Sequence, residues 1–110
     1  MAQRRAHELG DEEGKRYLED GFFTRLAVFA GDELEGLRAA AERVVTLAAE
    51  AAAASSQHYS IDGNRYAEIP RSTVQYEHSA GSRTLRVIEP FHYLDPVFDA
   101  LVEDARIVDP

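Results

Sequence analysis

Histidine and carboxylate side chains are the groups in this chain from which a metal centre would be built. The four histidines are His7, His58, His78 and His92. A facial triad that holds Fe(II) needs two histidines and one carboxylate on one side of the metal, with positions left open for substrate and oxygen. No histidine here has Asp or Glu two residues later, and no two histidines lie four residues apart. The sequence therefore predicts no metal site and no catalytic residue, and we expect surface or hydrogen-bonded histidines.

Other site motifs are missing from the sequence as well. The chain has no cysteine, which excludes disulfide scaffolds, thiolate nucleophiles and cysteine zinc sites. No serine lies in a nucleophile elbow, and no glycine-rich loop is arranged to bind phosphate. Asp62-Gly63-Asn64 is similar to part of a calcium loop, but the remaining ligands and the terminal glutamate are absent. A tight hairpin turn is the better interpretation of these three residues.

Composition and charge narrow the class of protein. The 110 residues make one small domain or part of a larger one, and 45% are hydrophobic, which is enough for a modest core. The net charge of −8 opposes binding to nucleic acid, because the basic residues are interleaved with acidic ones. No apolar run approaches the roughly 20 residues that span a bilayer, and the charged N-terminus lacks a secretory signal. We therefore expect a cytoplasmic protein without a membrane or nucleic-acid partner.

The elements that would position any site fall into two parts, the first being helical over residues 11–54 with one short strand. Residues 1–10 are polar and expected to be frayed. A short helix over 11–20 is predicted to end at Gly21, before a strand over 22–29 that is rich in aromatic and β-branched residues. The strongest signal is a helix over Gly31–Ala54, where apolar residues recur every three or four positions. Its expected buried face comprises Leu34, Leu37, Ala41, Val44, Leu47 and Ala48.

The second part, residues 55–110, is expected to contain strands and a short C-terminal helix. The runs on either side of Asp62-Gly63-Asn64 form one hairpin, and a second hairpin closes through residues 79–82 and stops at Pro90. Asp95-Pro96 is a helix start, with Asp as the N-cap and Pro in the first turn. Asp109-Pro110 repeats that signal with no helix after it. We therefore expect 1–110 to be a single, incomplete domain.

Four stretches of the chain together carry a family resemblance. They are Tyr17–Phe23 (a helix end, then Asp-Gly-Phe), Val28–Arg38 at the start of the long helix, Arg86–His92 at the end of a strand, and Asp95–Leu101 with Asp104–Pro110 as two short helices. In their order and spacing they resemble the N-terminal portion of the phytanoyl-CoA dioxygenase superfamily, which includes ectoine hydroxylase. The resemblance covers nearly the whole chain from Lys15 onward.

The resemblance implies the front part of a double-stranded β-helix (jelly-roll) oxygenase that uses Fe(II) and 2-oxoglutarate to hydroxylate a small molecule. In the family, the H-x-D pair, the distal histidine and the arginine that holds the 2-oxoglutarate carboxylate come later in the chain. No position here matches any of them. We therefore expect the chain by itself to be inactive and to bind neither cofactor tightly.

Arg86 and His92 are the two residues that a substrate would contact in a full-length relative, according to the resemblance. A guanidinium group suits an anionic part of a substrate, and His92 lies on a loop after a strand. The plainer alternatives are a surface salt bridge for Arg86 and a capping or core role for His92. The sequence favours these plainer alternatives, since position on a loop is only a statistical signal.

The predicted fold class is α+β, with the N-terminal helices packed on an antiparallel sheet. Two functions from different classes remain open: an N-terminal portion of a non-haem iron oxygenase, and a stand-alone, non-catalytic binding or dimerisation module. For the oxygenase portion we expect an open strand edge and an uncovered apolar face, which would lead to self-association or to association with a missing C-terminal part. The residues expected on that face are Val74, Tyr76, Leu85 and Val87.

Overall fold

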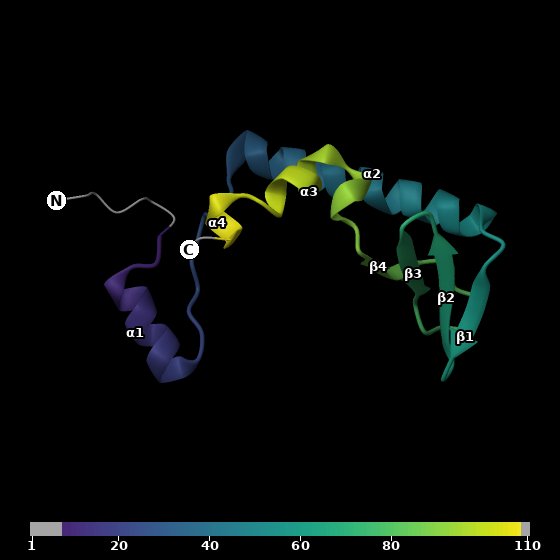
Figure 1. Ribbon diagram of the computed structural model, residues 1–110, viewed down its shortest axis with the longest axis horizontal. Coiled ribbons are helices and arrows are strands. Elements are labelled where there is room, and N and C mark those ends of the chain that lie inside the picture. Colours follow the sequence, from purple (N-terminus) through teal and green to yellow (C-terminus); the bar gives the residue numbers. More distant parts are fainter. Residues whose placement is uncertain (1–7, 109–110) are drawn as a thin grey trace.

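The computed structural model describes residues 8–108, which form an α+β fold with a four-stranded antiparallel sheet (Figure 1). Of the frayed stretch predicted over residues 1–10, residues 1–7 lie outside the described residues, as does the predicted helix start at Asp109-Pro110. The elements follow in the order α1 (Asp11–Asp20), α2 (Gly31–Ala54), β1 (His58–Ile61), β2 (Asn64–Ile69), β3 (Ser72–Tyr76), β4 (Leu85–Glu89), the 3-10 helix η1 (His92–Leu94), α3 (Pro96–Leu101) and α4 (Ala105–Val108).

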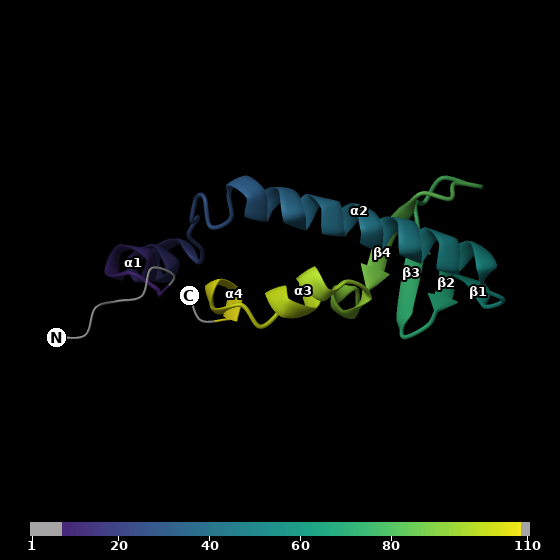
Figure 2. The ribbon, with the colours of Figure 1, turned by 90° about the horizontal axis from the view of Figure 1, so that it is seen from above.

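Helix α1 forms where the sequence predicts it but does not pack on the sheet. The Glu13 carboxylate accepts a hydrogen bond from the Gly10 N–H at 2.9 Å, and Gly21 ends the helix in the left-handed conformation with φ of 82°. No residue of α1 is buried, and Leu18 is 86% exposed. In both views α1 lies at the opposite end of the molecule from the sheet (Figures 1 and 2). The expectation that the N-terminal helices pack on the sheet is therefore wrong for α1.

The strand predicted over residues 22–29 is also wrong, because this segment is irregular. It connects α1 to α2, and no described strand pairs with it. Ala27 has a φ of 55°, outside the extended region that a strand requires. Aromatic and β-branched residues favour a strand only when a neighbouring strand supplies hydrogen bonds and packing, and here it does not.

Helix α2 is the longest helix of the described chain, as predicted, and its buried face shares Val44 and Ala48 with the predicted one. The buried residues recur every four positions, at Ala40, Val44, Ala48 and Ala52. Leu34 and Leu37 are partly buried, whereas Ala41 is exposed and Leu47 is 48% exposed, so the prediction is wrong for these last two. A ridge of alanines lets the helix backbone lie close to the sheet, and the larger leucine is left on the outside.

The sheet is a simple meander in the order β1-β2-β3-β4. Asp62 and Gly63 both have positive φ, at 51° and 81°, as a two-residue type I′ turn between β1 and β2 requires. This confirms the first predicted hairpin, and β3 and β4 confirm the second. The core lies between α2 and one face of the sheet, and it comprises Ala48, Ala52, Ala67, Ile69, Val74 and Tyr76.

The predicted uncovered face is consequently wrong in part. Val74 and Tyr76 belong to a central strand and are buried beneath α2. Leu85 is partly buried against the same core, and only Val87 is exposed, at the edge strand β4. Helix α2 therefore covers the apolar face that the sequence left open.

The C-terminal elements run back along α2 (Figure 2). Helix α3 begins as predicted, with the Asp95 side chain accepting a hydrogen bond from the Val97 N–H and with Pro96 at its first position.

The radius of gyration is 18.4 Å, compared with about 13 Å for a compact domain of this length. The molecule is thus elongated and leaves much surface uncovered. No helix in residues 8–108 is long and apolar enough to cross a membrane.

Candidate functional site

A β-bulge in β4 determines where the predicted site residue Arg86 points. Gln75 lies opposite Val87, but Tyr76 lies opposite Leu85, which leaves Arg86 as an additional residue without a partner position. A bulge changes the direction of the side chains around it. Leu85 accordingly faces α2, and Arg86 lines the same side of the sheet, whereas Val87 lies on the opposite face.

Arg86 borders a groove between α2, β4 and α3 with a volume of about 390 Å³. Apart from Arg86, the groove is lined by apolar side chains. Phe91 and Phe98 form one wall, with their rings edge to face and the centroids 5.1 Å apart. The other lining residues are Ala41, Val44, Val45, Leu85 and Ile88. We call this cavity the α2 groove.

The Arg86 guanidinium has no hydrogen bond or ion pair with any residue in the described part of the chain. The other arginines near the C-terminal helices are paired: Arg43 donates to Asp95, and Arg106 donates to Glu33 and Asp104. Of the two alternatives for Arg86, a surface salt bridge is therefore not found within residues 8–108. A cation beside an apolar cavity is an arrangement suited to a ligand with an apolar body and an anionic group.

The second predicted site residue, His92, does not line the α2 groove. It begins η1, and its Nδ1 lies 3.4 Å from Oδ1 of Asp99 in α3. Its ring also contacts the edge of Tyr93, with the centroids 5.4 Å apart. The structure thus does not bring Arg86 and His92 together. His92 is 40% exposed and pairs with Asp99, so it is neither a helix cap nor a core residue.

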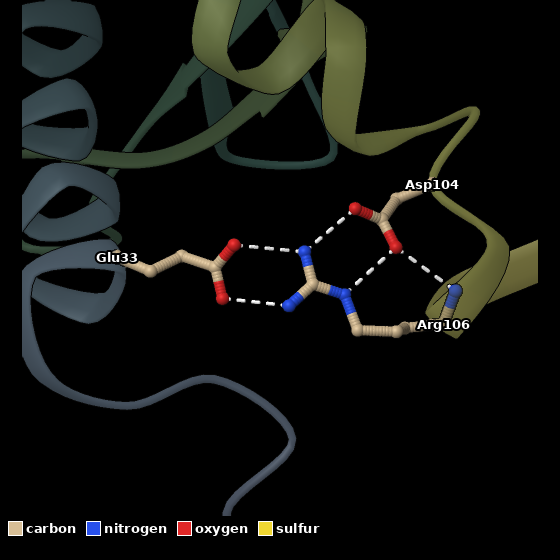
Figure 3. Close-up of polar contacts among 3 residues, drawn as sticks. All are labelled: Glu33, Asp104 and Arg106. Carbon is tan, nitrogen blue, oxygen red and sulfur yellow. Dashed lines mark hydrogen bonds and ion pairs between the residues drawn. The ribbon is translucent and has the colours of Figure 1, made fainter. Parts of the chain in front are cut away.

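Two polar clusters hold α3 and α4 against α2 and so fix one wall of the groove. The Arg43 Nε donates to Oδ2 of Asp95 at 2.8 Å. At the other end, Arg106 donates to both carboxylate oxygens of Glu33, at 2.6 and 2.8 Å, and also to Asp104 (Figure 3). The hydrogen bonds from Arg106 lower the pKa of Glu33, and those to Asp104 and Glu33 raise the pKa of Arg106.

The face of the sheet opposite α2 carries a connected set of polar side chains. Glu68 accepts hydrogen bonds from the Tyr59 hydroxyl at 2.6 Å and from Oγ1 of Thr73 at 2.8 and 2.9 Å. These bonds, the one from Tyr59 first, lower the pKa of Glu68, and the same bond raises the pKa of Tyr59. The Tyr59 and Tyr66 rings are stacked with their centroids 5.2 Å apart.

We call this surface the open face, and its residues are Tyr59, Tyr66, Glu68, Thr73, Gln75, Val87 and Glu89. None of them is buried. The sequence interpretation did not single out this set, although a signal was present: in β2, Tyr66 and Glu68 alternate with the buried Ala67 and Ile69. The pairing of strands that brings Tyr59 and Thr73 to Glu68 follows from the sheet register.

The remaining histidines hydrogen-bond to neighbouring protein groups. Nε2 of His58 lies 2.9 Å from the Ala52 carbonyl oxygen, and Nδ1 of His78 lies 3.1 Å from Oδ1 of Asn64. His7 lies outside the described residues. Among residues 8–108, no group of three or more His, Asp or Glu side chains is placed to hold a metal ion.

Comparisons with family models, curated proteins and solved structures found no match to this chain. The likeness to the phytanoyl-CoA dioxygenase superfamily therefore rests on the motifs in the sequence and their spacing.

Proposed function

We propose that the chain is the N-terminal portion of a phytanoyl-CoA dioxygenase-like oxygenase that uses Fe(II) and 2-oxoglutarate to hydroxylate a small molecule. The order and spacing of the four motif stretches support this proposal. The described residues offer no set of metal ligands, so the proposal assigns none to them. When bound, the iron and 2-oxoglutarate would supply the oxidising chemistry, and this part of the chain would supply one wall of the substrate-binding site.

The observation that carries the proposal is the difference between the two faces of the sheet. One face is apolar and covered by α2, and the other carries the hydrogen-bonded side chains of the open face. In a jelly roll with its helices on the outside, an uncovered sheet face turns toward the interior. The tyrosines, Glu68 and Thr73 would then line the interior, where their hydroxyl and carboxylate groups would orient a polar substrate.

This arrangement separates Arg86 from such a substrate. Because the bulge directs Arg86 to the α2 side, this residue would lie on the outer face of such a jelly roll. We therefore expect the substrate to contact the residues of the open face and not Arg86. His92 follows β4 beyond the open face, and its proximity to Asp99 accounts for its position without a substrate.

The coding region downstream of codon 110 tests the proposal. We expect it to continue in frame with an H-x-D motif, followed by a further histidine and an arginine. A reading frame that stops without an H-x-D motif would leave the alternative, a non-catalytic α+β binding or dimerisation module. A second test uses substitutions on the open face, such as Tyr66→Ala. If the chain is part of an oxygenase, this substitution should change substrate turnover by the complete protein; a non-catalytic module would show no turnover to change.

A further inference from the structure

We propose that the α2 groove binds a small apolar molecule that carries one carboxylate, and that Arg86 receives this carboxylate. The inference is independent of the proposed oxygenase function, because the groove lies on the face of the sheet opposite the open face. It depends on the shape, lining and charge of the groove alone.

The groove has the dimensions and lining of a ligand site. Its volume of about 390 Å³ falls within the range of roughly 300–1,000 Å³ that is typical of small-molecule pockets. Val45 is 50% exposed and Phe91 is 42% exposed, so apolar surface is accessible on two sides of it. Covering these side chains would remove them from water, which favours an apolar body in the ligand.

The charge of the groove determines which polar group a ligand should carry. The chain has 20 acidic and 12 basic residues, and most of the arginines in the described part are paired with carboxylates. Arg86 is the one charged residue of the groove lining, and it has no partner within residues 8–108. A guanidinium group binds a carboxylate through two parallel hydrogen bonds, and this pairing is stronger beside an apolar surface than in open water. A monoanionic ligand therefore matches the single cation.

The fold determines on which side of the sheet Arg86 lies, without any neighbouring acid. The bulge in β4 directs the side chain toward the groove, and the ion pair between Arg43 and Asp95 holds α3 in place as the facing wall. A site whose walls are held in this way loses little conformational entropy when it binds a ligand.

Isothermal titration calorimetry with decanoate as the probe tests the inference, with 1-decanol as the uncharged analogue. We expect decanoate to bind with one-to-one stoichiometry and decanol to bind about tenfold more weakly. Arg86→Gln should weaken decanoate binding by about tenfold and leave decanol binding unchanged. Arg83→Gln is the matched control, since Arg83 lies three residues away in the chain and does not line the groove; this variant should bind like the wild type.

A second variant tests whether the charged ligand occupies the groove. Val45→Asp places a carboxylate at an exposed position of the lining, and it should weaken decanoate binding more than decanol binding through like-charge repulsion. Equal affinities for decanoate and decanol, or an Arg86→Gln variant with unchanged decanoate affinity, would overturn the inference. So would a chain that binds no decanoate but whose self-association is lost in Val45→Asp, because the groove would then be an interface between two copies.

Discussion

Arg43 and Asp95 join the middle of α2 to the start of α3, with Nε of Arg43 2.8 Å from Oδ2 of Asp95. The other carboxylate oxygen, Oδ1, accepts the Val97 N–H at 3.0 Å and so caps α3. The Asp95 side chain is 8% exposed, whereas that of Arg43 is 56% exposed. A single buried carboxylate thus begins one helix and attaches it to another, across 52 residues of sequence.

Substitution of Asp95 should separate these two roles. Asp95→Asn keeps an oxygen that can cap α3 but removes the negative charge, whereas Asp95→Ala removes both. We therefore expect the urea midpoint to fall in the order wild type, Asp95→Asn, Asp95→Ala. Arg38→Ala is the control, because the Arg38–Glu35 pair is exposed on α2 and such pairs contribute little. An Asp95→Ala midpoint equal to that of wild type would contradict the assigned roles.

Stability should fall in acid because three carboxylates have lowered pKa values in the folded chain. The Arg43 guanidinium lowers the pKa of Asp95, and the Arg106 guanidinium lowers the pKa of Glu33. Hydrogen bonds from Tyr59 and Thr73 lower the pKa of Glu68. A group whose pKa is lower in the folded state stabilises the fold above its unfolded pKa, which is about 4. This stabilisation is lost as the pH falls through the folded pKa.

Urea unfolding from neutral pH down to about pH 3 measures this loss. We expect a constant free energy of unfolding near neutral pH and a decline that begins at about pH 4–5. In Glu33→Gln the decline should be shallower, since one of the carboxylates with a lowered pKa is gone. A free energy of unfolding that rises on acidification would mean that the assigned ion pairs do not stabilise the fold.

The alanine-rich face of α2 leads to a prediction about side-chain size. Val74 is fully buried beneath this face, and Val74→Ala should destabilise the fold by about 2 kcal/mol through lost burial and a residual cavity. Leu47→Ala removes a larger but half-exposed side chain and should cost less than about 1 kcal/mol. Chemical denaturation measures both values. A larger loss of stability in Leu47→Ala than in Val74→Ala would mean that Leu47 belongs to the buried face of α2, as the sequence pattern predicted.

The absence of a metal-ligand motif in the sequence leads to a binding prediction. The chain over residues 1–110 should bind neither Fe(II) nor 2-oxoglutarate tightly, because no H-x-D pair and no matching arginine occur in it. Calorimetry under anaerobic conditions measures both affinities. Stoichiometric Fe(II) binding at micromolar affinity, lost when two of the histidines are replaced, would contradict the prediction.

Short-range signals predicted the fold well where a few residues determine the geometry. Asp62-Gly63 specified a type I′ turn, Gly21 a helix end and Asp95-Pro96 a helix start, and all three are found. These features depend on local backbone preferences and hydrogen bonds, which the sequence contains in full.

Long-range packing was harder to predict. In α2 the alanine and leucine faces have the same spacing, and only contact with the sheet selects the alanines. In β4, alternation placed Leu85 and Val87 on one face, but the bulge at Arg86 puts them on opposite faces. The bulge depends on the pairing with β3, so neither the position of Arg86 in the α2 groove nor the polar contacts of the open face followed from the residues of one strand.

We propose that this chain is one part of a larger fold, which would leave surfaces of its sheet and helices without their cover. The accessible surface is 8135 Å², compared with about 6,100 Å² for a compact protein of 12.3 kDa. Exposed apolar side chains and strand edges recruit other chains. Sedimentation velocity of the purified chain over a range of concentrations tests the claim most directly. We predict that the mean sedimentation coefficient increases with concentration, and a concentration-independent monomer would contradict the claim.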